Sequence, residues 1–151
     1  MIIVSNTSPI NYLILIGQIE LLPELFRQIT IPQAVYRELS DMEAPSSVQT
    51  WIATPPAWLK IKSTSQASDI SIDFLDPGES AAILLAQELN ADLILLDDMK
   101  ARHAAQVRGL NITGILGILD QAATMNLIDL PATVKSLQNT SFWASDTKSD
   151  Y

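Results

Sequence analysis

With 151 residues, the chain has the length of a single domain and is long enough to bury about 70% of the surface that its unfolded form exposes. Its 48% of hydrophobic residues excludes an intrinsically disordered chain, and the absence of cysteine excludes disulfide frameworks, thiolate metal sites and thiol nucleophiles. A net charge of −8 argues against a protein that coats nucleic acid through its overall field, and leaves only a local nucleic-acid site.

The apolar N-terminus predicts a β-strand. Ile2, Ile3 and Val4 are strand formers. The segment has no basic leader, is interrupted by Asn6 and Pro9, and contains no apolar run long enough to span a bilayer. We therefore expect neither a signal peptide nor a membrane helix, and a cytoplasmic protein.

Turn and cap signals divide the next fifty residues into alternating helices and strands. Ser8 as N-cap and Pro9 at the first position predict a helix over residues 9–16, which Gly17 ends. The later elements are predicted as a helix over 19–26, a strand over 29–31, a helix over 32–40, a helix around Val48, Trp51 and Ile52, and a strand over 59–62. The Ser-rich residues 63–71 are predicted to form a loop.

The second half of the chain has a clearer pattern of alternating elements. It predicts a helix over 76–90, a buried strand over 91–98, a helix over 99–109, a short strand over 111–113 and a helix over 114–126. Such alternation indicates an α/β fold of three layers, in which a central parallel sheet is flanked by helices. We expect one domain over residues 1–140 and a polar tail over 141–151 that is either frayed or used in assembly.

Polar side chains follow two of the predicted strands directly. In a parallel α/β sheet, ligands bind beyond the carboxyl ends of the strands. Asn6 follows the first strand, and Asp97 and Asp98 follow the apolar strand of the second half. The two aspartates predict either a helix cap, for which Asp98 is the better candidate, or a cation site; both can hold together.

Two glutamates lie on the apolar sides of their helices. Glu79 closes a capping box with Asp76, yet it shares a stripe with Ala82 and Ile83 and should face inward. Glu38 shares a face with Leu39 in the last turn of its helix, where the macrodipole disfavours an anion by about 0.3–1 kcal/mol. A helix cap for Glu79 and a solvated surface position for Glu38 are the alternatives.

Together, these acids predict a divalent-cation site. Glu38, Glu79, Asp97 and Asp98 would repel one another in one pocket unless a cation offset their charge. Oxygen ligands, in a chain with one histidine, favour Mg²⁺ or Mn²⁺ over zinc. Lys100 and Arg102, just past the aspartates, either bind substrate phosphate or are solvated helix charges.

Four segments resemble, in order, those of PIN domains, specifically the VapC-like toxin nucleases. They are VSNTSPI (4–10), IPQAVYREL (31–39), LDPGESAAILLAQELNADLILLDDMKAR (75–102) and TGILGIL (113–119). The resemblance implies a Rossmann-like sheet over residues 1–140 and an acidic pocket that hydrolyses RNA with Mg²⁺ or Mn²⁺. It also implies a cognate antitoxin protein and a homodimer.

By position, the resemblance assigns catalysis and metal binding to four residues. These are Asn6, Glu38, Glu79 and Asp97, with Asp98 as an adjacent metal ligand and with Thr7 and Ser8 lining the pocket near the substrate. The family pattern has Asp where this chain has Asn6. Asn keeps a carbonyl oxygen but gives up one negative charge, which at an effective dielectric of ~20 removes on the order of 4 kcal/mol of gross attraction.

This departure leaves an alternative in a different functional class. In it, the chain is a catalytically weakened PIN fold that acts by binding RNA or a protein partner. A phospho-receiver domain fits less well, because its acidic pair after the first strand is absent here. Nucleotide-binding folds are not supported, since neither GxGxxG nor a GK[ST] phosphate loop occurs.

Overall fold

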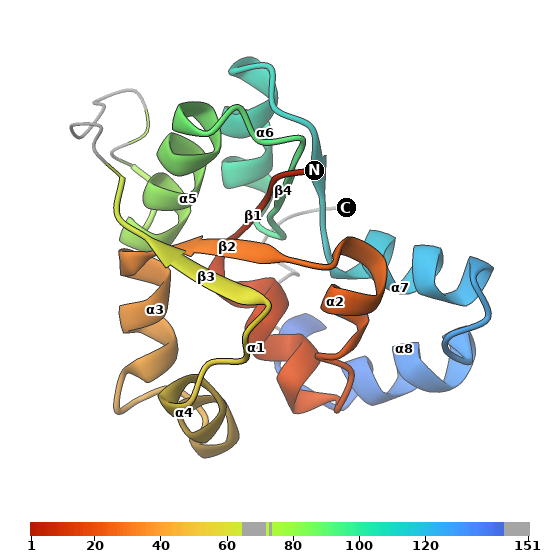
Figure 1. Cartoon of the computed structure of the whole chain (residues 1–151). Helices are drawn as coiled ribbons and strands as arrows, with labels where there is room; N and C mark the ends of the chain where they lie inside the picture. Colours follow the sequence, from red (N-terminus) through yellow and green to blue (C-terminus); the bar gives the residue numbers. More distant parts are fainter. Residues whose placement is uncertain (65–71, 73, 144–151) are drawn as a thin grey trace.

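A five-stranded parallel sheet forms the centre of the molecule (Figure 1). The computed structural model describes residues 1–64, 72 and 74–143. The strands are β1 (Ile3–Ser5), β2 (Ile29–Pro32), β3 (Leu59–Lys62), β4 (Leu93–Leu95) and β5 (Ile112–Thr113), in the order β3-β2-β1-β4-β5. The chain winds outward from β1 in one direction through β2 and β3, and in the other through β4 and β5. The point where the winding reverses, between β1 and β4, is where open α/β sheets bind ligands.

Helices connect the strands and cover both faces of the sheet. Within the described residues they are α1 (Thr7–Leu15), α2 (Leu21–Phe26), α3 (Gln33–Ser40), α4 (Ser46–Ala53), α5 (Pro77–Glu88), α6 (Met99–Val107), α7 (Ile115–Thr124) and α8 (Leu130–Gln138). None of the helices in the described part of the chain is long and apolar enough to cross a membrane.

Two hydrophobic cores, one on each face, hold the three layers together. Ile3 and Leu95 pack into the core under α1, α3 and α7, whereas Val4 and Ile94 pack into the core under α5 and α6. Successive strand residues point to opposite faces, so a strand buried on both faces must be apolar throughout. This explains the uninterrupted apolar runs in the sequence and confirms the predicted three-layer α/β fold with its parallel sheet.

The first helix begins earlier than its sequence predicts. Asn6, not Ser8, is the N-cap: its backbone is extended, and Thr7 is the first helical residue. Pro9 then occupies the third position of α1, where proline is tolerated because the amides of the first turn have no intrahelical acceptor. The prediction of Ser8 as the cap was therefore wrong, while Gly17 does follow the helix end with a φ of 72°.

The C-terminal part of the structure contains two features that the sequence patterns did not reveal. Helix α8 was not predicted, although Asp129 precedes it and Pro131 lies in its first turn. Phe142 is only 2% exposed and belongs to the core on the α1 face, so the domain is packed at least to this residue. Residues 144–151 of the predicted tail, and 65–71 of the predicted loop, lie outside the described residues.

Candidate active site

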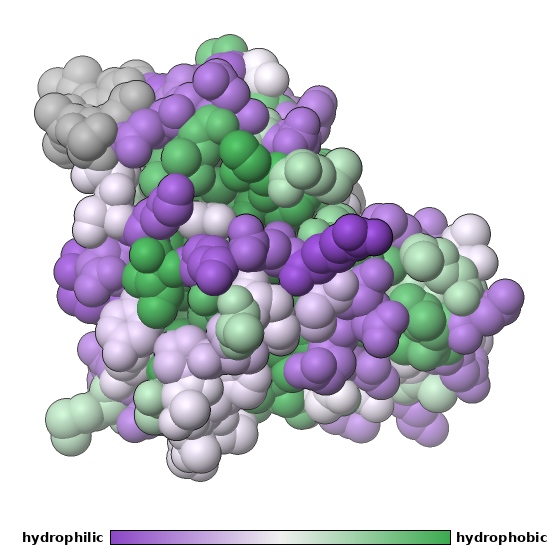
Figure 2. Space-filling view, viewed as in Figure 1, coloured by the Kyte–Doolittle hydropathy of each residue, from purple (hydrophilic) through white to green (hydrophobic). Residues whose placement is uncertain are grey.

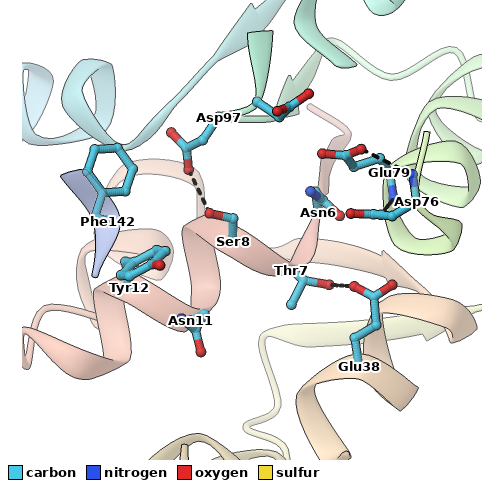
Figure 3. A pocket seen from close by; sticks show the side chains of 11 residues that line it. Asn6, Thr7, Ser8, Asn11, Tyr12, Glu38, Asp76, Glu79, Asp97 and Phe142 are labelled. Carbon is cyan, nitrogen blue, oxygen red and sulfur yellow. Dashed lines mark hydrogen bonds between the residues drawn. The ribbon is translucent and has the colours of Figure 1, made fainter. Parts of the chain in front are cut away.

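A cavity of about 360 Å³ lies at the carboxyl end of β1 and β4 (Figure 3). One set of its lining residues consists of five acids and an amide: Asn6, Glu38, Asp76, Glu79, Asp97 and Asp98. The others are Thr7, Ser8, Asn11, Tyr12 and Phe142. The structure thus brings together all the acids that the sequence singled out, from α3, α5 and the segment after β4.

Asn6 is held at the floor of this cavity by its backbone. Its amide N–H donates to Leu95 O at 3.1 Å, which continues the pairing of β1 with β4. The side chain is only 4% exposed, and among the described residues its Oδ1 has no hydrogen-bond partner. A buried carbonyl oxygen without a partner costs about 1–3 kcal/mol, and a cation or hydrogen-bond donor brought beside Asn6 would remove this cost.

Glu38 joins the first turns of two other helices. Its carboxylate accepts the hydroxyl of Thr7 at 2.5 Å and the backbone N–H of Gly78 at 2.8 Å. A Cβ atom on Gly78 would lie 2.5 Å from Glu38 Oε1, so only glycine allows this approach. Burial raises the pKa of Glu38, and the Thr7 hydrogen bond partly opposes this rise. Glu38 is therefore not the solvated residue of the alternative prediction.

Glu79 is both a helix cap and a cavity residue. Its backbone N–H donates to Asp76 Oδ1 at 2.8 Å, and its Oε1 accepts the Asp76 N–H at 3.3 Å, which completes the predicted capping box. Burial, together with the charges of Asp76 and Asp98, raises the pKa of Glu79 to about 7. Burial is the main cause of this raised pKa, and the neighbouring carboxylates add to it.

Asp97 and Asp98 have different local roles, although both line the cavity. Asp97 is only 6% exposed; its Oδ1 accepts the backbone N–H of Ile115 at 2.8 Å, and its Oδ2 accepts the Ser8 hydroxyl at 3.4 Å. Asp98 caps α6 by accepting the N–H of Ala101 at 3.1 Å, as one reading of the sequence predicted. Asp97 is thus oriented by α7 and α1, and Asp98 by its own helix.

The lining residues suit Mg²⁺ or Mn²⁺ by donor type. All the candidate ligands offer oxygen, and Asn6 Oδ1 lacks a partner among the described residues. A cation would also offset the repulsion from Asp76 and Asp98, which adds to the effect of burial on the pKa of Glu79. In the ranges that the structure describes, however, no three Asp, Glu or His side chains form a group close enough to hold a metal as they stand. The cavity therefore presents separate carboxylates rather than a closed cluster.

The predicted phosphate-binding residues do not line the cavity. Lys100 is exposed on α6, as is the neighbouring His103. Arg102 is partly buried, and its guanidinium group lies on the same side of Gly114 as the Asp97 carboxylate. A Cβ atom built on Gly114 would lie 3.4 Å from Arg102 Nη1 and 2.6 Å from Asp97 Oδ1. Arg102 thus lies near the acidic residues but outside the cavity lining.

Four lining residues were missed by sequence reasoning as parts of a site: Asn11, Tyr12, Asp76 and Phe142. Asp76 was predicted only as the N-cap of its helix, which it is. Asn11 and Tyr12 follow Ser8 by three and four positions, so the three share one face of α1, and this spacing was the available signal. Phe142 carried no such signal, because its place in the cavity depends on the packing of the chain after α8.

Comparison with known protein families agrees with this geometry. A family model described as "PIN domain" matches residues 2–150, which is nearly the whole chain. No curated protein matches the chain.

Proposed function

Because the chain belongs to the PIN domain family, we propose that it is a Mg²⁺- or Mn²⁺-dependent ribonuclease that hydrolyses RNA phosphodiester bonds with a metal-activated water. PIN domains are generally nucleases and typically use divalent metals. The observation that carries the proposal is that Glu38, Glu79 and Asp97 meet in one cavity with the Asn6 carbonyl, which has no hydrogen-bond partner among residues 1–64, 72 and 74–143.

In this proposal each residue has a stated role. The residues that would hold the cation, directly or through water, are Asn6, Glu38, Glu79, Asp97 and Asp98. When bound, a divalent cation lowers the pKa of a coordinated water and stabilises the leaving oxygen. Ser8 keeps Asp97 oriented, and Thr7 keeps Glu38 oriented, through their hydroxyl groups. Lys100 and Arg102 contact substrate phosphates from the adjacent helix.

The test is incubation of the purified protein with a structured RNA and Mn²⁺. We expect cleavage that EDTA abolishes, and a loss of at least roughly 10–100-fold in Asp97→Asn. Glu24→Gln, at an exposed position on α2, is a matched control and should cleave like the wild type. Failure to see EDTA-sensitive cleavage of any RNA would remove the proposal.

A second candidate function is supported by the neutrality of Asn6. A PIN fold in which the carboxylates stay separate could bind RNA or a protein partner without efficient hydrolysis. Asn6→Asp distinguishes the two, because it restores the missing charge at the cavity floor. A large gain in cleavage would identify the natural chain as a weakened nuclease, whereas no gain would mean that the remaining acids suffice.

The resemblance to VapC-like toxins supports a proposal for the biological role of the chain and its partners. In this setting the chain is the toxin of a toxin–antitoxin pair, is restrained by a cognate antitoxin protein, forms a homodimer and acts in the cytoplasm. A chain without cysteine agrees with a reducing compartment. Light scattering on the purified protein tests the dimer, and growth arrest on expression of the chain without its genomic neighbour tests the toxin.

A further inference from the structure

An uncharged surface lies over α4. Residues 44–59 contain no Asp, Glu, Lys or Arg, although the whole chain has 17 acidic and 9 basic residues. The part of the surface over α4 is mostly pale in Figure 2, without the deep purple of charged side chains. Much of this segment is exposed, so burial in the core does not explain why it lacks charge. The neutrality is a property of the surface itself.

Two tryptophans lie within this surface. The spacing i, i+3, i+4, i+7 places four uncharged residues, 47, 50, 51 and 54, on one side of α4. The turn after α4 then brings a second tryptophan against the first, with ring centroids 5.7 Å apart and planes at 48°. We call the five residues the tryptophan face: Ser47, Thr50, Trp51, Thr54 and Trp58.

The tryptophan rings are only partly covered by their own chain. Trp51 and Trp58 both pack against the core on the α1 face, yet each is only partly buried. Among the described residues neither indole N–H has a hydrogen-bond partner, and neither is a buried atom. Tryptophan is enriched at the centre of protein–protein interfaces, where its ring covers apolar area and its N–H meets an acceptor. The tryptophan face therefore has the composition of an interface.

Charge limits the kind of partner that fits this face. Nucleic acid requires Lys or Arg opposite its phosphates, and the tryptophan face has neither. A basic protein would be attracted to the acidic surfaces rather than to an uncharged one. A second copy carries the same net charge of −8, and like charges that face each other across an interface are strongly unfavourable. Two copies therefore meet best where neither is charged.

We propose that two copies of the chain associate through the tryptophan face. A two-fold dimer uses the same patch on both copies, so Trp51 and Trp58 of one copy pack against those of the other, and the hydroxyl groups of Ser47 and Thr50 supply hydrogen bonds around them. This inference rests on the proposed homodimer and names the surface that forms it. It does not depend on the proposed ribonuclease activity.

Sedimentation equilibrium of the full chain in EDTA, without RNA, tests the face. We expect the wild type to dimerise. Thr50→Glu places a like charge in the face of each copy and should weaken dimerisation by at least about 30-fold. The control Gln121→Glu adds the same charge at an exposed position of α7 and should dimerise like the wild type. Far-UV circular dichroism verifies that both variants are folded.

The possible results of this experiment lead to different conclusions. A wild type that stays monomeric at its highest soluble concentration would remove both the homodimer and the face. A dimer that Thr50→Glu leaves intact would keep the homodimer and overturn the face. If Thr50→Glu weakens RNA binding while the dimer persists, the face contacts nucleic acid and the proposal is wrong.

The absence of cysteine from the chain allows a second test. Thr50→Cys introduces one thiol, so a bifunctional maleimide can join two copies only through position 50. We expect cross-linked dimers of this variant, and none of Gln121→Cys under the same conditions. Equal cross-linking of the two variants, or of neither, would overturn the face. Because both tests omit RNA, the ribonuclease proposal can fail while the face stands, and the face can fail while EDTA-sensitive cleavage stands.

Discussion

The Glu79 carboxyl group accepts the Asp76 amide while it lines the acidic cavity, so one side chain contributes both to a helix start and to the candidate active site. Burial and neighbouring carboxylates raise its pKa from 4.5 to about 7. The folded protein then holds a proton that the unfolded chain releases between these pH values. The contribution of Glu79 to stability in the absence of metal is therefore lost as the pH rises from about 4.5 to about 7.

We expect Glu79→Gln to reduce this pH dependence, because glutamine can keep the capping box but carries no charge. The melting temperature of the variant in EDTA should decline less than that of the wild type between pH 5 and pH 7.5. Thermal unfolding across this range measures the difference. The control Glu24→Gln should follow the wild-type curve, and a Glu79→Gln curve parallel to the wild type would contradict the predicted charge state.

Gly78 provides a second prediction at the residue scale. In Gly78→Ala, the new methyl group would meet the Glu38 carboxylate at 2.5 Å, so that Glu38 must leave its hydrogen bonds. We expect a destabilisation of about 1–3 kcal/mol in chemical unfolding. In a Glu38→Ala background the same substitution should cost little, because the clash is gone. Additive effects of the two substitutions on the free energy of unfolding would mean that the close approach of Glu38 to Gly78 does not limit the residue at position 78.

At the scale of elements, the turn after α8 docks Phe142 into the core beside Tyr12. Phe142→Ala should therefore destabilise the protein by about 3–5 kcal/mol, as truncation of a buried phenylalanine does. Phe74→Ala is the matched control, because Phe74 is 63% exposed and its loss should change the stability by less than about 0.5 kcal/mol. Similar unfolding free energies for the two variants would show that the segment after α8 is not part of the folded core.

Local sequence patterns were sufficient to predict some of the helices and strands, but not all. Apolar runs and helix start signals such as Asp76-Pro77 predicted the parallel sheet and α5, because these signals are local. The start of α1 was misplaced because Ser8 is an equally good local cap, and only the pairing of Asn6 with Leu95 fixes where β1 ends. The contact between Tyr12 and Phe142 could not be predicted, because the two rings meet only through tertiary packing.

At the scale of the whole molecule, charge is spread unfavourably for binding nucleic acid. The chain has 17 acidic and 9 basic residues, and no Lys or Arg lines the cavity in the described part of the structure. On the face shown in Figure 2, hydrophilic and hydrophobic residues are interspersed. Binding through the general field of the protein is thus weak, and contacts at the site must supply most of the affinity.

We therefore expect RNA affinity to depend weakly on monovalent salt. If only Lys100 and Arg102 contact phosphates, the slope of log K against log salt should be no steeper than about −2. Fluorescence anisotropy with a short single-stranded RNA over a range of KCl concentrations measures this slope. Lys100→Ala should reduce its magnitude by roughly 0.7, whereas an unchanged slope would exclude a phosphate contact.

The strand order has a consequence for synthesis on the ribosome. β1, made from the first residues, takes the central place in the sheet and pairs on one side with β4, so that Ile3 lies beside Leu93. Asp97 is oriented by the still later Ile115 amide. A nascent chain that has completed α1 to α5 already contains Asn6, Glu38 and Glu79, but it lacks the strand and the aspartate that complete the cavity. Under the proposed ribonuclease function, a ribosome-bound fragment that ends before β4 would thus be inactive toward nearby RNA.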